Sequence, residues 1–182
     1  MPNWCANSLV LEHEDNSMIV RAENAFARGE FCQEFFPCPE DLKNTTSPNR
    51  DEALAEQLYE KYGYSDWYNF QVSEWGTKWD FGDPNGINEV NDNSIVLYFD
   101  SAWSPPIAMM EKLEELGFTV NLMYDEPGMA FCGQYIDGND TTYEYGELSA
   151  DKIDEEIPVD INETFCIAEH KRMWEEENGE EE

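Results

Sequence analysis

The sequence predicts an α+β fold in which one antiparallel sheet carries helices on one face. Hydrophobic residues make up 41% of the 182 residues and aromatic residues 14%, which is enough for one core despite 41 Asp and Glu residues. Segments with the apolar period of strands alternate with segments that have the period of amphipathic helices. We therefore expect a folded domain over residues 1–148, an acidic extension with a helix over 149–178, and a disordered acidic tail over 179–182.

The first three elements follow the order strand, helix, strand. Asn3 to Glu12 is apolar without helical periodicity, which predicts a strand, and Met18 to Phe26 repeats apolar residues at helical spacing. Gly29 is a typical helix stop. Phe31 to Phe36 resumes an extended apolar pattern that Pro37 closes, so we expect a second strand there.

Residues of about 40–93 interrupt this pattern and are expected to form an insertion. A polar stretch precedes a short helix over 51–62, and residues 83–86 have the composition of a turn. Six aromatic residues lie within residues 67–81, too many to leave in water, so we expect them to pack on the sheet or to line a pocket: Trp67, Tyr68, Phe70, Trp75, Trp79 and Phe81.

The second half repeats the order strand, helix, strand. Ser94 to Phe99 is an unbroken apolar run typical of a central strand. Ser104 is expected to cap a helix with an apolar stripe that ends at Gly117, and Phe118 to Leu122 alternates as a strand does. A further hairpin is predicted over 130–136 and 142–147, and a last helix over 162–177. This order predicts a ferredoxin-like sandwich with an insertion between its halves, a C-terminal hairpin and a final helix.

The net charge of −31 restricts the possible partners. A body with this charge repels nucleic acid and anionic lipid at long range, so we expect neither direct nucleic-acid binding nor membrane binding. Basic proteins are the favoured partners. Five cysteines without CxxC spacing predict reduced thiols rather than disulfides or a zinc site, and we expect no metal and no cofactor.

A stripe of like charge on the predicted helix over 51–62 is the first candidate site. Glu52, Glu56 and Glu60 recur every four residues and share one helix face, without basic residues between them along that face. A folded array of carboxylates presents a phosphate-like field to a protein that binds DNA. Three carboxylates of the later helix are expected to extend this surface: Glu111, Glu114 and Glu115.

Tryptophan residues form the second candidate site. We expect Trp4, Trp79 and Trp103 to belong to the core, because Trp is a large apolar side chain. The alternative is an aromatic pocket with a cation at its edge, able to take a planar or anionic ligand. That pocket would be built from five residues: Trp75, Lys78, Trp79, Asp100 and Trp103.

Three motifs resemble a known family. They are MPNWCAN over residues 1–7, WGTKW over 75–79 and AWSPP over 102–106, with a weaker match in EPG and FCG over 126–133. Together they resemble the YubB-type, or Api-like, ferredoxin-like proteins of bacteriophages and plasmids, over roughly residues 1–133. The resemblance implies a ferredoxin-like fold and a mobile-element origin. The function of that family is largely unknown, so the resemblance supplies no catalytic residues.

These observations lead to one hypothesis and two alternatives. The hypothesis is a non-enzymatic protein, located in the cytoplasm of a bacterial host, that inhibits a basic nucleic-acid-binding protein of a defence or restriction system by DNA mimicry. The first alternative is a small-ligand or peptide-binding module with a Trp-lined pocket. The second alternative is an enzyme. Its class is unidentified, because neither His13 nor His170 lies in a recognisable nucleophile context. Both a monomer and a homo-oligomer are compatible with the sequence.

Overall fold

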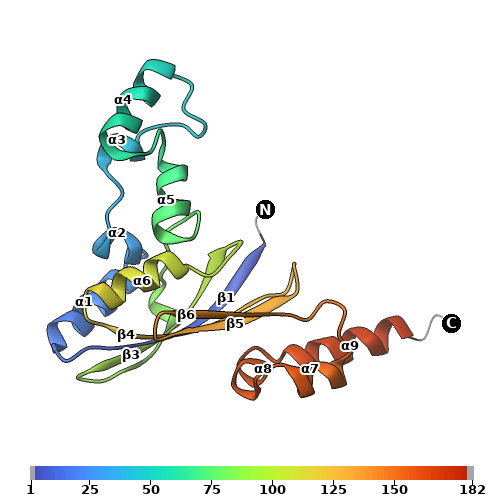
Figure 1. Cartoon of the computed structure of the whole chain (residues 1–182). Helices are drawn as coiled ribbons and strands as arrows, with labels where there is room; N and C mark the ends of the chain where they lie inside the picture. The colour runs from blue at the N-terminus through green and yellow to red at the C-terminus, as the bar shows by residue number, and fades with distance from the viewer. Residues whose placement is uncertain (1–2, 180–182) are drawn as a thin grey trace.

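The computed structural model describes residues 3–179, and it shows one antiparallel sheet of six strands in the order β2-β3-β1-β4-β5-β6 (Figure 1). The central strand, β1, pairs with β3 from Trp4 opposite Ala102 to Glu12 opposite Ser94. The first four strands and two long helices follow one another as βαββαβ, which confirms the ferredoxin-like fold. The strand bounds are β1 (Trp4–Glu12), β2 (Ile87–Val90), β3 (Ser94–Ala102), β4 (Thr119–Glu126), β5 (Phe131–Ile136) and β6 (Asn139–Glu144).

Helices α1 (Asn16–Ala27) and α6 (Ile107–Glu115) cover one face of the sheet (Figure 1). Asp15 caps α1 by accepting a hydrogen bond from the Ser17 amide at 2.9 Å. The expected cap of α6 is wrong. Ser104 instead donates its hydroxyl to the Gly76 carbonyl at 2.9 Å, and the residue at the helix start is Pro106.

The predicted strand over residues 31–36 is also wrong, because Phe31–Phe35 forms the short helix α2. Two tertiary contacts cause this. The Asp80 carboxylate accepts hydrogen bonds from the Cys32 and Gln33 amides at 2.7 and 2.9 Å, and the Phe31 ring stacks on Phe81. The second strand of the fold is β2, so the insertion lies between α1 and β2 rather than over 40–93 between the two halves.

The insertion contains α3 (Glu40–Lys43), α4 (Glu52–Tyr62), α5 (Trp67–Trp75) and the 3₁₀ turn η1 (Pro84–Gly86). Helices α3 and α4 stand away from the sheet, and α5 leads back to it (Figure 1). The Trp75 side chain is 1% exposed and donates its indole N–H to the Phe36 carbonyl at 2.8 Å. An ion pair of 3.0 Å between Glu74 and Lys112 joins α5 to α6. These contacts fix the base of the insertion.

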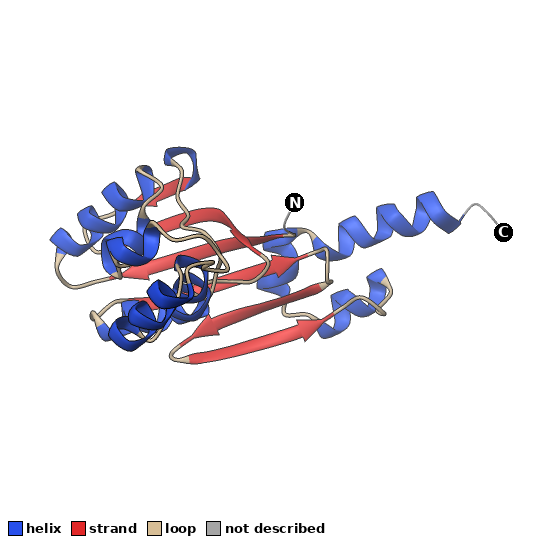
Figure 2. Cartoon of the chain, turned by 90° about the horizontal axis from the view of Figure 1, so that it is seen from above, coloured by secondary structure: helices blue, strands red, loops and turns tan. Residues whose placement is uncertain are grey.

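The C-terminal extension packs against the opposite face of the sheet. It consists of α7 (Ala150–Glu156), α8 (Val159–Phe165) and α9 (Ile167–Gly179), so the single helix predicted over 162–177 is wrong. Cys166 interrupts the helix with a φ of 52°. A second apolar cluster holds these helices on the sheet: Cys132, Tyr145, Ile153, Ile157, Ile161, Ile167 and Ala168. The end of α9 extends beyond the sheet (Figure 2).

Two further predictions concern the rest of the chain. The predicted disordered tail over 179–182 has its last three residues outside the described part of the chain, and α9 includes Gly179. The five thiols form no disulfide in the structure; Cys166 is exposed and the other four are buried. Among the described residues, no helix has the length and apolar character needed to cross a membrane.

Candidate functional site

The stripe on α4 is exposed along its whole length. Asp51 accepts a hydrogen bond from the Leu54 amide at 3.1 Å and so begins the helix, while Gly63 ends it with a φ of 79°. Glu52, Glu56 and Glu60 are exposed, and within residues 3–179 none of them forms an ion pair. The three carboxylates therefore face solvent without an ion-pair partner in the part of the chain that the structure describes.

Most basic residues of the chain are already occupied. Seven of the ten Lys and Arg residues form ion pairs, and together they contact only eight carboxylates. The seven are Arg21, Arg28, Lys43, Lys61, Lys112, Lys152 and Arg172. The internal bases thus leave most of the negative charge unneutralised.

The structure does not bring the carboxylates of α6 next to those of α4. Helix α6 lies on the sheet, whereas α4 lies in the outer part of the insertion, with α5 between them (Figure 1). Glu111 and Glu115 are exposed. Glu114 accepts hydrogen bonds from the Tyr135 hydroxyl at 2.6 Å and from the Gly138 amide at 3.2 Å. Glu114 therefore holds the β5–β6 hairpin onto α6, and it is not a free surface charge.

The expected core position of Trp4, Trp79 and Trp103 is wrong. Their side chains are 47%, 39% and 42% exposed, respectively. Trp4 begins β1, Trp103 follows β3, and Trp79 lies in the loop after α5. At this end of the sheet β2 no longer covers β3, because β2 pairs with β3 only as far as Leu97. Of the five residues proposed for the alternative pocket, Trp75 belongs to the core instead.

A cavity of about 370 Å³ opens at this free edge of β3. The rings of Trp4 and Trp79 stand at its border, with centroids 5.9 Å apart and planes inclined by 39°. Segment 79–83 forms one wall and the end of β3, from Asp100 to Ala102, forms the other. This edge cavity therefore combines two half-exposed indoles with two acidic segments.

The three aspartates of the edge cavity differ in their partners. Asp80 accepts hydrogen bonds from three backbone amides, and burial raises the pKa of its carboxyl. Asp83 accepts from the backbone and side-chain nitrogens of Asn85 through one oxygen, both at 2.7 Å. Asp100 is exposed, and among the described residues its carboxylate has no hydrogen-bond partner. Asp100 is thus available to a ligand.

Lys78 lies beside the edge cavity and is held by aromatic rings. Its ammonium nitrogen is 4.5 Å from the ring centroid of Trp79, 5.0 Å from that of Trp103 and 6.0 Å from that of Tyr68. Trp103 occupies the left-handed region with a φ of 72°, where a bulky side chain is strained. The structure therefore brings Lys78, Trp79 and Trp103 together and places Asp100 on the neighbouring cavity wall.

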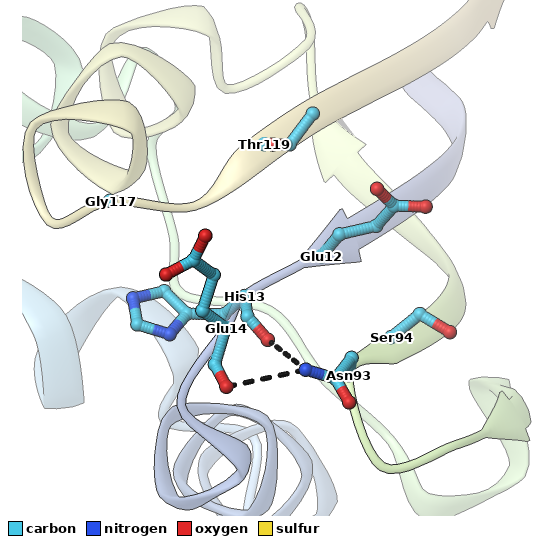
Figure 3. A pocket seen from close by; sticks show the side chains of 7 residues that line it. All are labelled: Glu12, His13, Glu14, Asn93, Ser94, Gly117 and Thr119. Atoms are coloured by element: carbon cyan, nitrogen blue, oxygen red, sulfur yellow. Dashed lines mark hydrogen bonds between the residues drawn. The ribbon is translucent and has the colours of Figure 1, made fainter.

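A second cavity, of about 450 Å³, lies at the opposite end of β1 and β3 (Figure 3). His13 accepts a hydrogen bond from the Asp15 amide through Nδ1 at 3.0 Å, and its Nε2 lies 3.2 Å from the Leu116 carbonyl. Asn93 donates to the carbonyls of His13 and Glu14 at 3.1 and 3.2 Å. The polar groups here hold three chain segments together, and both imidazole nitrogens are engaged.

A third cavity, of about 300 Å³, lies between β4 and α9. Asp125 is 7% exposed there and accepts a hydrogen bond from the Tyr145 hydroxyl at 2.7 Å. Burial raises the pKa of Asp125 to about 6, although Tyr145 and the nearby His170 act against this shift. Lys171 also lines this cavity, but it donates to the Gly146 carbonyl at 3.3 Å. Sequence analysis missed Asp125, because only its position against α9 distinguishes it from the other carboxylates.

The described part of the chain offers little for metal chemistry. Within residues 3–179, no group of three or more His, Cys, Asp or Glu side chains is placed to hold a metal ion. The buried thiols are protonated rather than nucleophilic, since burial raises the pKa of Cys38 to about 11 and that of Cys132 to about 12. The exposed features of the site are therefore carboxylates and indoles.

Comparisons with known proteins place the chain in a family. A family model described as the ferredoxin-like domain in Api92-like protein matches residues 74–164, half of the chain. A crystal structure of a protein api92 from Yersinia pseudotuberculosis is similar at 12% identity and a TM-score of 0.41, covering 80% of this chain and 99% of that chain. A search of the curated proteins found no match. The match to the family model shows that the chain belongs to the Api92-like ferredoxin-like family, whose function is unknown.

Proposed function

We propose that the protein binds a basic, nucleic-acid-binding protein of a bacterial host and inhibits it by DNA mimicry, without catalysis. The observation that carries this proposal is the α4 stripe. Glu52, Glu56 and Glu60 are exposed on the outer part of the insertion and have no basic partner within the described chain. Neighbouring carboxylates on such a face are about 6 Å apart, close to the spacing of successive phosphates on one strand.

The charge of the whole chain supports the same partner class. A net charge of −31 produces a field that attracts a basic groove from a distance, which raises the association rate and makes binding sensitive to salt. Glu111 and Glu115 add to this field from helix α6, whereas the hydrogen bonds of Glu114 give it a role in holding the fold together. We therefore restrict the mimic surface to α4.

The state of the polar side chains favours binding over catalysis. The imidazole of His13 is held by backbone groups on both sides, and the buried Asp125 is hydrogen-bonded to Tyr145. Neither group lies beside an activated nucleophile. A defence or restriction component of the host fits the mobile-element origin that the sequence resemblance implies.

The test reverses the stripe and compares it with an equal change elsewhere. The variant Glu52→Lys, Glu56→Lys, Glu60→Lys alters the net charge by six units. The control, Glu156→Lys, Glu163→Lys, Glu169→Lys, alters it equally on the exposed C-terminal helices, where these side chains form no hydrogen bond within the described residues. Host proteins retained by the wild type at low salt are identified, purified and tested for displacement from DNA.

The expected result is that the wild type and the C-terminal control both displace a retained protein from DNA, and that the α4 variant does not. The salt dependence of any residual binding should be shallower for the α4 variant, because fewer ions are exchanged at the interface. Equal displacement by the α4 variant and the control would show that the stripe is not the mimic surface. A retained partner that binds no DNA would overturn mimicry itself.

A further inference from the structure

We infer that the edge cavity between Trp4 and Trp79 binds the guanidinium group of an arginine side chain presented by the basic partner. This inference rests on the proposed function for the identity of the partner, but it concerns a different surface from α4. It assigns a role to the half-exposed tryptophans and the partnerless carboxylate at the free edge of β3.

The aromatic part of the edge cavity is suited to a flat cation. Trp4 and Trp79 are 47% and 39% exposed, and their ring centroids lie 5.9 Å apart at the cavity border. Exposed aromatic groups of this kind mark interaction sites, because Trp dominates the energy of many interfaces. A guanidinium is planar and weakly hydrated, and it stacks on indole faces better than an ammonium does.

The acidic part of the edge cavity supplies the matching charge. Asp100 has no hydrogen-bond partner among the described residues, and Asp83 uses only one oxygen, toward Asn85. No Lys or Arg is among the residues that line the cavity in the described chain. A carboxylate beside two indoles therefore offers a guanidinium both charge-assisted hydrogen bonds and a stacking surface.

The chain itself shows that one of these two rings, that of Trp79, accepts a cation. The Lys78 ammonium rests over Trp79 at 4.5 Å and over Trp103 at 5.0 Å, just outside the edge cavity. The two other cavities described above lack a pair of exposed indoles beside a partnerless carboxylate. His13 and Asn93 are engaged with backbone groups in one of them. The other has one indole, that of Trp174, and its carboxylate, Asp125, is already hydrogen-bonded to Tyr145.

The first experiment uses a small probe in place of the partner. N-acetyl-arginine methylamide is titrated into the ¹⁵N-labelled protein, and the indole N–H signals of Trp4 and Trp79 are followed by NMR. N-acetyl-citrulline methylamide is the matched control, because it has nearly the same shape without the charge. We expect saturable shifts of these two signals with the arginine probe and affinity lower by at least about fivefold with the citrulline probe. Equal responses to both probes, or none to the arginine probe, would overturn the inference.

The second experiment uses variants with equal charge. Asp100→Asn removes the partnerless carboxylate, and Asp92→Asn makes the same change on the exposed β2–β3 turn, outside the edge cavity. Asp100→Asn should lower the affinity for the arginine probe about fivefold, and Asp92→Asn should leave this affinity unchanged. Unchanged thermal unfolding would confirm that both variants are folded. Equal weakening by the two variants would show that only the general field attracts the probe.

The outcomes separate this inference from the proposed function. If reversal of α4 abolishes DNA displacement while Asp100→Asn affects neither the probe nor the partner, the mimic surface stands and the arginine site fails. If Asp100→Asn weakens the probe while the α4 reversal has no effect on the partner, the arginine site stands and the α4 proposal fails.

Discussion

The Asp125→Asn substitution should change how the stability of the protein depends on pH. Asp125 is 7% exposed between β4 and α9, and its hydrogen bond comes from the Tyr145 hydroxyl. Asn keeps an oxygen that accepts this bond and removes the ionisable group. The substitution therefore isolates the cost of burying a charged carboxylate.

The size of this effect follows from the pKa of Asp125. Burial raises it from 3.8 to about 6, so the folded state binds the proton more tightly than the unfolded state. As the pH falls from about 7 to about 4, the wild type should gain about 2.4 kcal/mol of unfolding free energy relative to Asp125→Asn. Above pH 7 this group contributes no further pH dependence, and the Asn variant should be the more stable protein.

The assay is urea unfolding at several pH values between 4 and 8, with a reductant present to protect the thiols. Other carboxylates have a pKa that is lowered by an ion pair, as Glu34 has beside Arg21. Their protonation on acidification lowers the unfolding free energy of both proteins equally, so their contributions cancel in the difference. Asp92→Asn controls for the change of net charge. Its unfolding free energy should differ from that of the wild type by the same amount at every pH. A wild-type minus Asp125→Asn difference that stays flat from pH 8 to pH 4 would refute the reasoning and show that water reaches Asp125.

Two further predictions test side-chain burial and backbone packing, both by urea unfolding. Trp75→Ala should lower the unfolding free energy by about 3–5 kcal/mol because Trp75 is 1% exposed, whereas Trp103→Ala should cost less than about 2 kcal/mol because its side chain is 42% exposed. Similar losses in these two variants would contradict the assignment of Trp75 to the core. Gly82→Ala should be strongly destabilising, since its new Cβ would lie 2.3 Å from the Phe26 carbonyl oxygen, while Gly63→Ala, with open space around it, should cost only about 1 kcal/mol. Equal effects of the two glycine substitutions would show that segment 79–83 shifts freely away from α1.

The elements that were predicted correctly are those whose burial leaves a recognisable pattern of apolar residues in the sequence. Helix α1 buries one regular face, which helical apolar spacing reveals, and strands β1 and β3 carry apolar runs without that spacing. Strand β2 is a short edge strand with mostly exposed residues, so it has no such pattern. Helix α2 was taken for a strand because its N-terminal cap, Asp80, lies 48 residues away from Cys32 in the sequence.

The edge cavity was predictable only in part. Trp79 and Asp100 were named from the sequence, but Trp4 was assigned to the core and Asp83 was taken only as a turn residue. The cavity joins the start of β1, the end of β3 and segment 79–83, and no spacing along the chain indicates that these three meet. The α4 stripe was visible because a single helix carries it, so its geometry follows from helical periodicity alone.

Salt should act in opposite directions on folding and on partner binding, because the chain uses its few bases internally. Lys61 joins α4 to Asp41 of α3 at 2.7 Å, and Lys112 joins α6 to Glu74 of α5 at 3.0 Å, so these bases brace the insertion. The Lys61–Asp41 pair is exposed and so contributes little to stability, and only the Lys112–Glu74 pair is partly buried. The self-repulsion of a body at −31 is large by comparison, and it falls as the screening length shortens. Raising the NaCl concentration from about 0.05 M to about 0.5 M should therefore raise the midpoint of thermal unfolding and weaken the binding of a basic partner. If binding weakens and the midpoint of thermal unfolding falls as well, salt loosens the insertion. The loss of binding would then not be evidence of electrostatic competition.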